Sequence, residues 1–578
     1  MKTRTLILLI ALFLPVSAQQ QRGTITGRVV TDEGAPLSGV TVMLSSYSGS
    51  AISGTLKRAL TDQEGNFQFT NLAARSYTIN VTETLGYVQP PRPSNVPQPT
   101  YRIGENATLR LTRGGVITGR VTYANGDPMI GVYVSAIRVR DTNGAPVNSQ
   151  STFLARLTDD RGVYRIYGLT AGTYVVTVNH GGTTFYGQQT PFDGDAPTYY
   201  PSATRDTAVE IQVQTGIEVS GIDIRHRSER GFAVSGKIIG GSESTGPMNF
   251  LASVFIRTFP TGLNVGITAV QPGTGNGFSF LGLPDDEYEL VAELPSSDGD
   301  GSQLSEPRRI TVRGGDVTGI ELRLMPLASI AGKVVLEPSP NACDPKAKLS
   351  PEELTLIPRR EEKPTDSPAL LQRYHGVFAP SDKGEFKLNR LAAGRYRIET
   401  ILPGENWFVK SISSSGSSGA SAASPAGAST AAAKPVANDL ARLGAMLKSG
   451  EKLTGVTVTI ADGAASLRGK ILPAKDGGKL PTRLRVHLIP TEATAADDVL
   501  RFGEVLTSDG SFAFTNFAPG KYWLLAKPVA DNEATDRLPP PAAWDAAERL
   551  KLRKAAEAAK TEIELKACQR VKDHVLKF

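Results

Sequence analysis

The sequence predicts an all-β protein built from five β-sandwich domains in tandem, with a short C-terminal helix. Three observations support this prediction: five similar opening strands, five apolar pairs each followed by a tyrosine at a fixed spacing, and short alternating runs separated by turns. Apolar residues that alternate along short segments are typical of strands with one buried face. A chain of 578 residues is also too long for one hydrophobic core, which predicts several domains of ordinary size.

The N-terminus has the pattern of an export signal. Lys2 and Arg4 precede a short apolar run, and Val16-Ser17-Ala18 places small residues before Gln19. We therefore expect residues 1–18 to be a signal peptide and the mature protein to be secreted, periplasmic or at the cell surface. No later stretch is long and apolar enough to predict a transmembrane helix.

The five opening strands share an alternating pattern with a central glycine. In the first of them, Ile25, Gly27 and Val29 share one face of the strand, whereas Thr26 and Arg28 share the other. The five segments are Thr24–Val29, Val116–Val121, Ala233–Ile238, Ser329–Val334 and Ser466–Ile471.

A second signature follows each opening strand. Two apolar residues two positions apart share a sheet face, and a tyrosine follows eight residues later in every copy. The apolar-x-x-Gly-x-Tyr stretch in copies two, four and five is typical of a tyrosine corner, in which the hydroxyl bonds to nearby backbone. We therefore interpret five tyrosines as structural rather than catalytic: Tyr77, Tyr174, Tyr288, Tyr396 and Tyr522.

These signatures divide the chain into repeats. Short connections between the copies restrict motion between domains, so we expect an extended rod. The predicted domains are residues 19–112, 113–227, 228–325, 326–461 and 462–578.

Two segments break the repeat pattern. Residues 411–436 are nearly all Ser, Ala, Gly and Pro. Because the closing strand of copy four, Leu453–Ile460, comes only after this tract, we predict a loop inside copy four rather than an interdomain hinge. Residues 542–560 predict a helix on the last sandwich, over Trp523, with a face formed by Trp544, Leu552, Ala555 and Ala559.

The repeat resembles the bacterial carboxypeptidase regulatory-like domain, a transthyretin-like Greek-key β-sandwich. The resemblance rests on the Gly-Arg/Lys-Val/Ile opening, on Gly39-Val40-Thr41-Val42 and Gly131-Val132-Tyr133-Val134, and on the tyrosine stretch, and it covers nearly the whole mature chain. It implies a non-catalytic exported module whose fold is shared with carbohydrate-binding and starch-binding-like domains. Fold alone does not assign function, so this implication is an analogy.

Composition excludes several classes of function. The 63 Lys and Arg nearly balance the 57 Asp and Glu, and part of the excess lies in residues 548–578, which argues against a nucleic-acid-binding surface. Five histidines and two cysteines leave little material for a metal cluster, and no cofactor is expected. His226-Arg-Ser-Glu229 has a zinc-like spacing, but no room remains around it for a peptidase domain.

The two cysteines predict a disulfide between Cys343 and Cys568. They are the only cysteines available to each other within the chain, and an exported protein matures in an oxidising compartment. Nothing in the sequence shows that the two sites meet.

Two groups of aromatic residues are candidate ligand-binding residues. Tyr199, Tyr200, Trp407 and Phe408 lie between the corner tyrosine and the closing strand of their copies. Sugars stack on exposed aromatic rings, and polar groups at the rim fix their orientation. The alternative is that these aromatics pack over a sandwich edge.

The sequence therefore predicts an exported, non-catalytic binding or scaffold protein. Carbohydrate or another cell-envelope component is the leading expected partner. A purely structural spacer or adhesion stalk is the alternative, and an accessory part of a peptidase system is a third interpretation. The oligomeric state and the identity of the ligand stay open.

Overall fold

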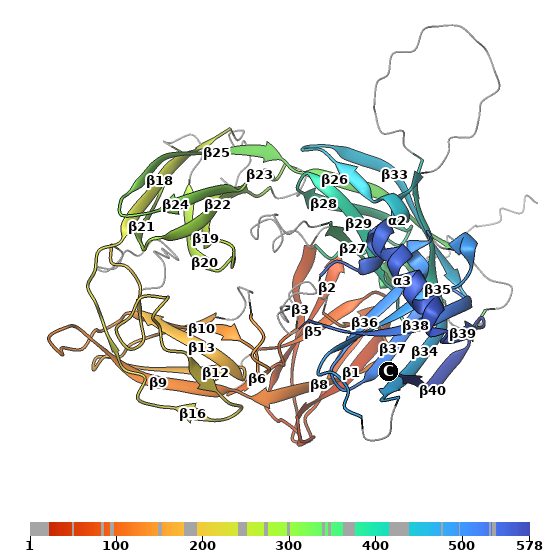
Figure 1. The fold of residues 1–578 in the computed structure, drawn as a ribbon, viewed down its shortest axis with the longest axis horizontal. Coiled ribbons are helices and arrows are strands. Elements are labelled where there is room, and N and C mark those ends of the chain that lie inside the picture. The colour runs from red at the N-terminus through yellow and green to blue at the C-terminus, as the bar shows by residue number, and fades with distance from the viewer. Residues whose placement is uncertain are drawn as a thin grey trace, which may run out of the picture.

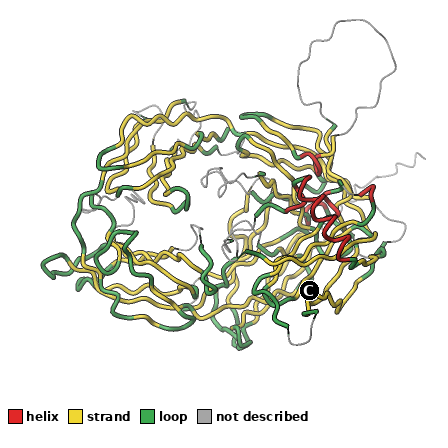
Figure 2. The backbone as a smooth tube through the Cα atoms, in the orientation of Figure 1, coloured by secondary structure: helices red, strands yellow, loops and turns green. Residues whose placement is uncertain are grey.

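The computed structural model describes residues 22–48, 51–82, 86–92, 98–147, 153–178, 194–240, 251–270, 276–296, 301–337, 342–344, 348–361, 376–415, 438–474, 478–495, 497–530, 533 and 539–578. The predicted signal peptide lies outside these residues. Strands dominate the described chain, and the helices gather at one side of the molecule (Figure 2). The all-β prediction is confirmed. No helix among the described residues is long and apolar enough to cross a bilayer.

The described residues contain five large hydrophobic clusters, one for each predicted copy. We number the copies sandwich one to sandwich five in chain order; the exact domain boundaries stay a prediction. In four of them the strands form two separate sheets, whereas in sandwich three β23 joins the strands into one eight-stranded sheet.

The first three sandwiches contain 25 of the strands. Sandwich one has β1 (Arg22–Thr31), β2 (Thr41–Ser48), β3 (Ala51–Leu60), β4 (Asn66–Ala73), β5 (Tyr77–Thr82), β6 (Tyr87–Val88), β7 (Thr100–Tyr101) and β8 (Asn106–Arg113). Sandwich two has β9 (Gly115–Thr122), β10 (Tyr133–Arg140), β11 (Phe153–Leu157), β12 (Val163–Leu169), β13 (Gly172–Val178), β14 (Thr198–Tyr199), β15 (Ile211–Val213), β16 (Glu218–Val219) and β17 (Ile224–Arg225). Sandwich three has β18 (Phe232–Ile239), β19 (Ala252–Thr258), β20 (Asn264–Val270), β21 (Gly277–Leu283), β22 (Asp286–Leu294), β23 (Gln303–Ser305), β24 (Arg308–Val312) and β25 (Val317–Pro326).

The last two sandwiches also carry the helices. Sandwich four has β26 (Ala328–Glu337), η3 (Pro351–Glu353), β27 (Thr355–Arg360), β28 (Glu385–Leu391), β29 (Gly394–Ile401), β30 (Trp407–Ser414), β31 (Asn438–Asp439), α2 (Leu440–Leu443), β32 (Ala445–Leu447) and β33 (Lys452–Asp462). Sandwich five has β34 (Ala465–Leu472), β35 (Leu484–Pro490), η4 (Ala493–Ala495), η5 (Val499–Arg501), β36 (Gly503–Thr507), β37 (Ser511–Phe517), β38 (Gly520–Pro528), η6 (Ala542–Trp544), α3 (Ala546–Ala559), β39 (Glu562–Leu565) and β40 (Arg570–Lys577).

Each opening strand lies between two partners in its sheet. It pairs antiparallel with the strand that carries the apolar pair and parallel with the closing strand, as β26 does with β28 and β33. A Cβ atom built on Gly119 would lie 1.9 Å from the carbonyl oxygen of Ile222 in the neighbouring segment. The same distance is 2.4 Å or less in every copy, which explains the repeated glycines: Gly27, Gly119, Gly236, Gly332 and Gly469.

All five signature tyrosines make the same local hydrogen bond. Each is almost fully buried, and each hydroxyl donates to the backbone carbonyl oxygen four residues earlier, at distances from 2.7 to 2.9 Å. This is the geometry of a tyrosine corner. Burial raises the pKa of every one of these phenols, so they stay protonated and structural: Tyr77, Tyr174, Tyr288, Tyr396 and Tyr522.

Removing one corner hydroxyl is expected to destabilise its sandwich. Tyr174→Phe leaves the Thr170 carbonyl oxygen without its tyrosine donor, at 2.7 Å in the native protein, and we expect a loss of about 1–3 kcal/mol in the free energy of unfolding. Urea unfolding measures this loss. Tyr133→Phe is the matched control, because Tyr133 lies in the same sandwich with an exposed fraction of 57%. Equal unfolding midpoints for the two variants would contradict the corner assignment.

The C-terminal helix lies where the sequence predicts it. Helix α3 packs over β35 and β38 of sandwich five, and its cluster includes Ile489 and the partly buried Trp523. The buried face differs in detail from the predicted one. Leu552 is buried as expected, but Ala556 and Arg549 complete the face instead of Ala555 and Ala559. Arg549 is accommodated because its guanidinium donates to the Ala543 carbonyl at 2.7 Å.

The Ser/Ala-rich tract connects two neighbouring strands of one sheet. The order β28-β26-β33-β30-β31 places both β30 and β33 in sandwich four, on either side of the tract. Residues 411–414 belong to β30, so the predicted loop begins later than expected. The remainder of the predicted loop, residues 416–436, lies outside the described residues.

The expectation of an extended rod is wrong. The five sandwiches follow a closed path, in which sandwich four returns to sandwich one and sandwich five lies beside sandwich four (Figure 1). Ser76 of sandwich one donates through its amide to the Glu352 carbonyl at 3.3 Å and through its hydroxyl to the Glu353 carbonyl at 2.5 Å. Arg75 and Arg102 pair with the same two glutamates. Short connections restrict motion, but these contacts between distant residues set the direction in which the chain turns.

Candidate binding site

A cleft of about 880 Å³ lies between sandwiches two and three. One wall comes from the segments around β14 and after β17, and the other from the start of β18, the turn after β19 and the turn before β22. The two sandwiches are fixed here, because Leu263 of sandwich three joins a buried cluster with Ile137 and Val175 of sandwich two. The cleft is therefore formed before any ligand binds.

Phe259 is the aromatic platform of the cleft. It lies in the turn after β19, and its amide donates to the Glu287 carbonyl at 2.8 Å. The guanidinium of Arg309 lies 3.9 Å from the centre of its ring. Arg309 in turn pairs with Glu289, whose exposed fraction is 1%, at 3.4 Å. The Arg309 guanidinium therefore covers one face of the ring, and its pairing with Glu289 helps to hold the ring in place.

Charged groups of both signs line the rest of the cleft. Arg205, Arg227 and Arg230 face acidic residues from both sandwiches, among them Asp206 and Asp286. A hydrogen bond from the Thr204 hydroxyl lowers the pKa of Asp206, so its carboxylate is ionised near neutral pH. A ligand in this cleft therefore meets both donors and acceptors rather than a field of one sign.

The four predicted binding residues differ in their burial and in their neighbours. Tyr199 lines the cleft, but its exposed fraction is only 4% because Ala203 and Leu263 pack around it. Burial raises the pKa of its hydroxyl, while Arg205 acts in the opposite sense. Tyr200 is partly buried against the core of sandwich two. The expectation that Tyr199 is exposed is wrong, because sandwich three covers it.

Trp407 and Phe408 open strand β30 rather than a loop, and both are partly buried. Trp407 packs against the core of sandwich four, and its carbonyl accepts a hydrogen bond from Asn516 of sandwich five at 2.8 Å. These contacts match the alternative interpretation, in which the aromatics pack at a sandwich edge. The residue that sequence reasoning missed is Phe259. Its signal was present, because Phe259-Pro260 repeats the aromatic-proline pattern of Tyr200-Pro201.

A second cavity, of about 480 Å³, lies between sandwiches four and five under α3. Most of its lining residues are apolar, with His487 and Arg397 as buried polar residues and Glu504 partly buried. Burial lowers the pKa of His487 to about 4 and raises that of Glu504. Trp544 closes one side, with its ring 5.1 Å from the guanidinium of Arg359. Charged side chains also line this cavity, among them Arg397 and Glu399.

The histidine of the zinc-like sequence is engaged elsewhere. His226 is buried, with Nδ1 3.1 Å from the Ser228 hydroxyl and Nε2 3.8 Å from Asp195. Glu229 pairs instead with Arg227 at 2.5 Å. His226 and Glu229 therefore do not act as a pair of metal ligands in this arrangement.

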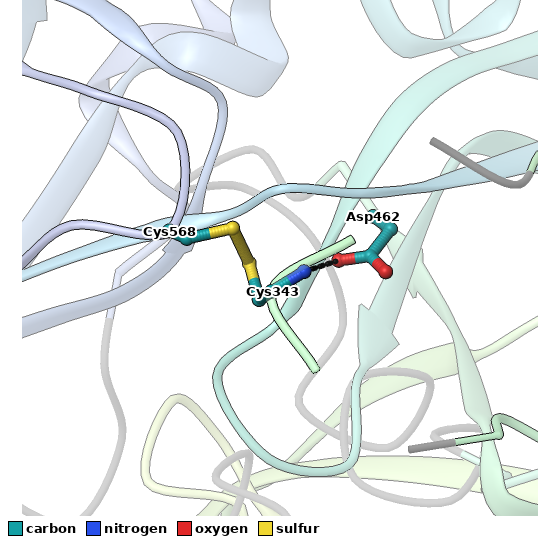
Figure 3. A group of neighbouring side chains, drawn as sticks. All are labelled: Cys343, Asp462 and Cys568. Carbon is teal, nitrogen blue, oxygen red and sulfur yellow. Dashed lines mark hydrogen bonds between the residues drawn. A yellow bond between two sulfur atoms is a disulfide. The ribbon is translucent and has the colours of Figure 1, made fainter. Parts of the chain in front are cut away.

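The two cysteines form a disulfide that joins sandwiches four and five. Cys343 and Cys568 have their Cα atoms 5.2 Å apart, at a sequence separation of 225 (Figure 3). Cys343 also donates its amide to Asp462 at the end of β33. The link therefore adds a covalent bond to a junction that already carries hydrogen bonds.

Solved structures similar to this chain include a pilin and repeat units of a collagen binding protein. Two B repeat units of the collagen binding protein of Staphylococcus aureus share 13% identity, with 76% of this chain and 100% of that chain covered and a TM-score of 0.14. The minor pilin GBS52 of Streptococcus agalactiae shares 16% identity, with 36% and 96% covered and a TM-score of 0.19. The Bacillus anthracis TIE protein shares 14% identity, with 52% and 51% covered and a TM-score of 0.14. TM-scores this low carry no argument about function.

No curated protein matches this chain. The family comparison matches one segment, residues 24–110, which runs from β1 into β8 and contains most of the core of sandwich one. The resemblance seen in the sequence is thereby confirmed for this segment: residues 24–110 match the carboxypeptidase regulatory-like domain.

Proposed function

We propose that this protein is an exported, non-catalytic binding and scaffold protein whose cleft between sandwiches two and three takes a segment of polysaccharide. The observation that supports this most strongly is the combination of a fixed aromatic platform, Phe259, with charged groups of both signs in a cleft of about 880 Å³. Sugars present apolar ring faces that stack on aromatics and hydroxyls that bond to mixed donors and acceptors.

The closed arrangement of the sandwiches favours a preformed site. The second and third sandwiches share a buried cluster, and the third and fourth are joined by Arg390 and Glu293 at 2.7 Å. Because the walls of the cleft are already ordered, little binding free energy is lost in ordering them, which favours affinity. The proposal is supported by the predicted signal peptide of residues 1–18, which would export the protein to where the polysaccharides of the cell envelope are available.

Replacing the platform is expected to weaken polysaccharide binding. Phe259→Ala removes the stacking surface, and we expect at least a tenfold loss of affinity for an oligosaccharide chosen from a glycan array. Phe259→Tyr keeps the ring and should bind nearly as the native protein does. Arg230→Gln, at the rim, should weaken binding severalfold without touching the platform. Titration calorimetry measures all three variants.

Tyr133→Ala is the matched control, because Tyr133 is an exposed aromatic of sandwich two outside the cleft. Thermal unfolding of each variant separates lost binding from lost folding. Unchanged affinity in a folded Phe259→Ala variant would overturn the cleft as the binding site. Failure of the native protein to bind any glycan would instead favour the structural spacer or adhesion stalk.

A further inference from the structure

A cluster of potential metal ligands lies at the junction of sandwiches four and five, separate from the cleft. The sulfur atoms of Cys343 and Cys568 and a carboxylate oxygen of Asp462 all lie within 4.8 Å of one another (Figure 3). We propose that these three residues form a zinc site once the disulfide is reduced. Thiolate sulfur and carboxylate oxygen are ordinary ligands of Zn²⁺.

The three ligand atoms already lie close enough to reach one ion. With a Zn–S distance of about 2.3 Å, tetrahedral geometry holds two sulfurs roughly 3.8 Å apart. The two sulfurs, which are bonded to each other in the oxidised protein, must therefore move apart after reduction, and the carboxylate oxygen lies within 4.8 Å of both. The cysteines are both partly exposed, so a reductant and a metal ion can reach the sulfurs.

Other contacts hold the three ligands together without the disulfide. Arg570, two residues after Cys568, donates to the Asn406 side chain at 2.7 Å and to the Glu405 carbonyl at 2.8 Å. The Asn406 carbonyl accepts from the amide of Gly463, next to Asp462, at 2.9 Å. The Cys568 amide donates to the Gly463 carbonyl at 3.3 Å. Reduction of the disulfide therefore leaves both sulfurs near the carboxylate.

The third ligand is held in a fixed orientation. Asp462 has an exposed fraction of 8%, and its Oδ1 accepts hydrogen bonds from the amides of Cys343 at 3.3 Å and Gly463 at 2.6 Å. These bonds orient the carboxylate beside the sulfurs, as outer contacts do for metal ligands. A bound cation also offsets the cost of keeping this carboxylate away from water.

The reaction balances with a dithiol as the reductant. Its two thiols supply two electrons and two protons, so the S–S bond between Cys343 and Cys568 breaks, two thiols form, and the reductant becomes a disulfide. Zn²⁺ then displaces both thiol protons to solvent and forms two Zn–S bonds and one Zn–O bond, with the fourth position left for water. The junction is thus closed by a disulfide when oxidised and by a metal ion when reduced.

Cobalt binding to the full-length protein tests this site. Protein reduced with a dithiol and then freed of it under anaerobic conditions is titrated with Co²⁺, which gives a thiolate charge-transfer absorption when bound by cysteine. We expect one Co²⁺ per reduced chain, displaced by Zn²⁺, and no such absorption in the oxidised protein. Asp462→Asn should weaken binding at least tenfold, and Cys343→Ser should abolish the absorption.

Asp382→Asn is the matched control, since this exposed acid of sandwich four lies outside the ligand group. Zn²⁺ should also raise the urea midpoint of the reduced native protein but not that of Cys343→Ser. Absence of thiolate absorption in the reduced native protein would overturn the proposal. Equal affinity in Asp462→Asn would remove Asp462 from the site, and equal affinity in Cys343→Ser would place the ion elsewhere.

Discussion

Replacing both cysteines by serine is expected to lower the free energy of unfolding by about 5 kcal/mol. The link between Cys343 and Cys568 closes a loop with a sequence separation of 225 residues, and in the entropic account a longer loop constrains the unfolded chain more. The native state should change little, because the hydrogen bonds of Asn406, Asp462 and Arg570 hold the junction independently.

Tryptophan fluorescence during urea unfolding measures this loss of stability in the two sandwiches that the disulfide joins. The chain has three tryptophans, Trp407, Trp523 and Trp544, and all lie in sandwiches four and five. The reduced native protein, with metal removed by a chelator, serves as the control. It should have the same urea midpoint as the double variant. An unchanged midpoint, or two free thiols in the denatured but unreduced native protein, would contradict the prediction.

Gly119→Ala is expected to destabilise sandwich two by about 3 kcal/mol or more. The new Cβ would lie 1.9 Å from the carbonyl oxygen of Ile222, which is backbone and cannot rotate away. That oxygen also accepts the hydroxyl of the buried Tyr164 at 2.6 Å. The substitution therefore forces the closing segment away from β9 and disturbs a buried hydrogen bond.

Hydrogen exchange of β9 and β12 amides, read with thermal unfolding, measures the loss within sandwich two. Gly194→Ala is the matched control, because nothing lies within 4 Å of its added Cβ. We expect the control to have the same thermal unfolding midpoint as the native protein. If the amides of β9 and β12 exchange at the same rates in Gly119→Ala and Gly194→Ala, the close approach of the strands does not explain the repeated glycine.

The local features of the fold were predictable from sequence because they depend on short-range spacing. A tyrosine corner joins residues four apart, so the pattern around Tyr174 or Tyr396 contains the whole interaction. Alternation likewise assigns Ile25 and Val29 to the buried face of one strand, and both are buried. The helix over Trp523 followed from composition, although its buried face includes Arg549, which is accommodated by a backbone acceptor.

The candidate sites were less predictable because they depend on neighbouring sandwiches. Tyr199 has the sequence setting of an exposed aromatic, yet Leu263 from the next sandwich covers it. Phe259 carries the same aromatic-proline signal, but only the position of Arg309 and the facing wall of sandwich two make it a platform. Aromatic residues near a sandwich edge look alike in sequence whether the next domain covers them or leaves them open.

The sequence by itself therefore determined the repeat, the strands of each copy and the structural tyrosines, since each depends on contacts within a few residues or on alternation. Only the tertiary structure decided the closed path of the chain, the cleft and the junction of the two cysteines. Ser76 meets Glu353, and Cys343 meets Cys568, across more than two hundred residues. Such meetings depend on the summed orientations of whole sandwiches, which no local spacing encodes.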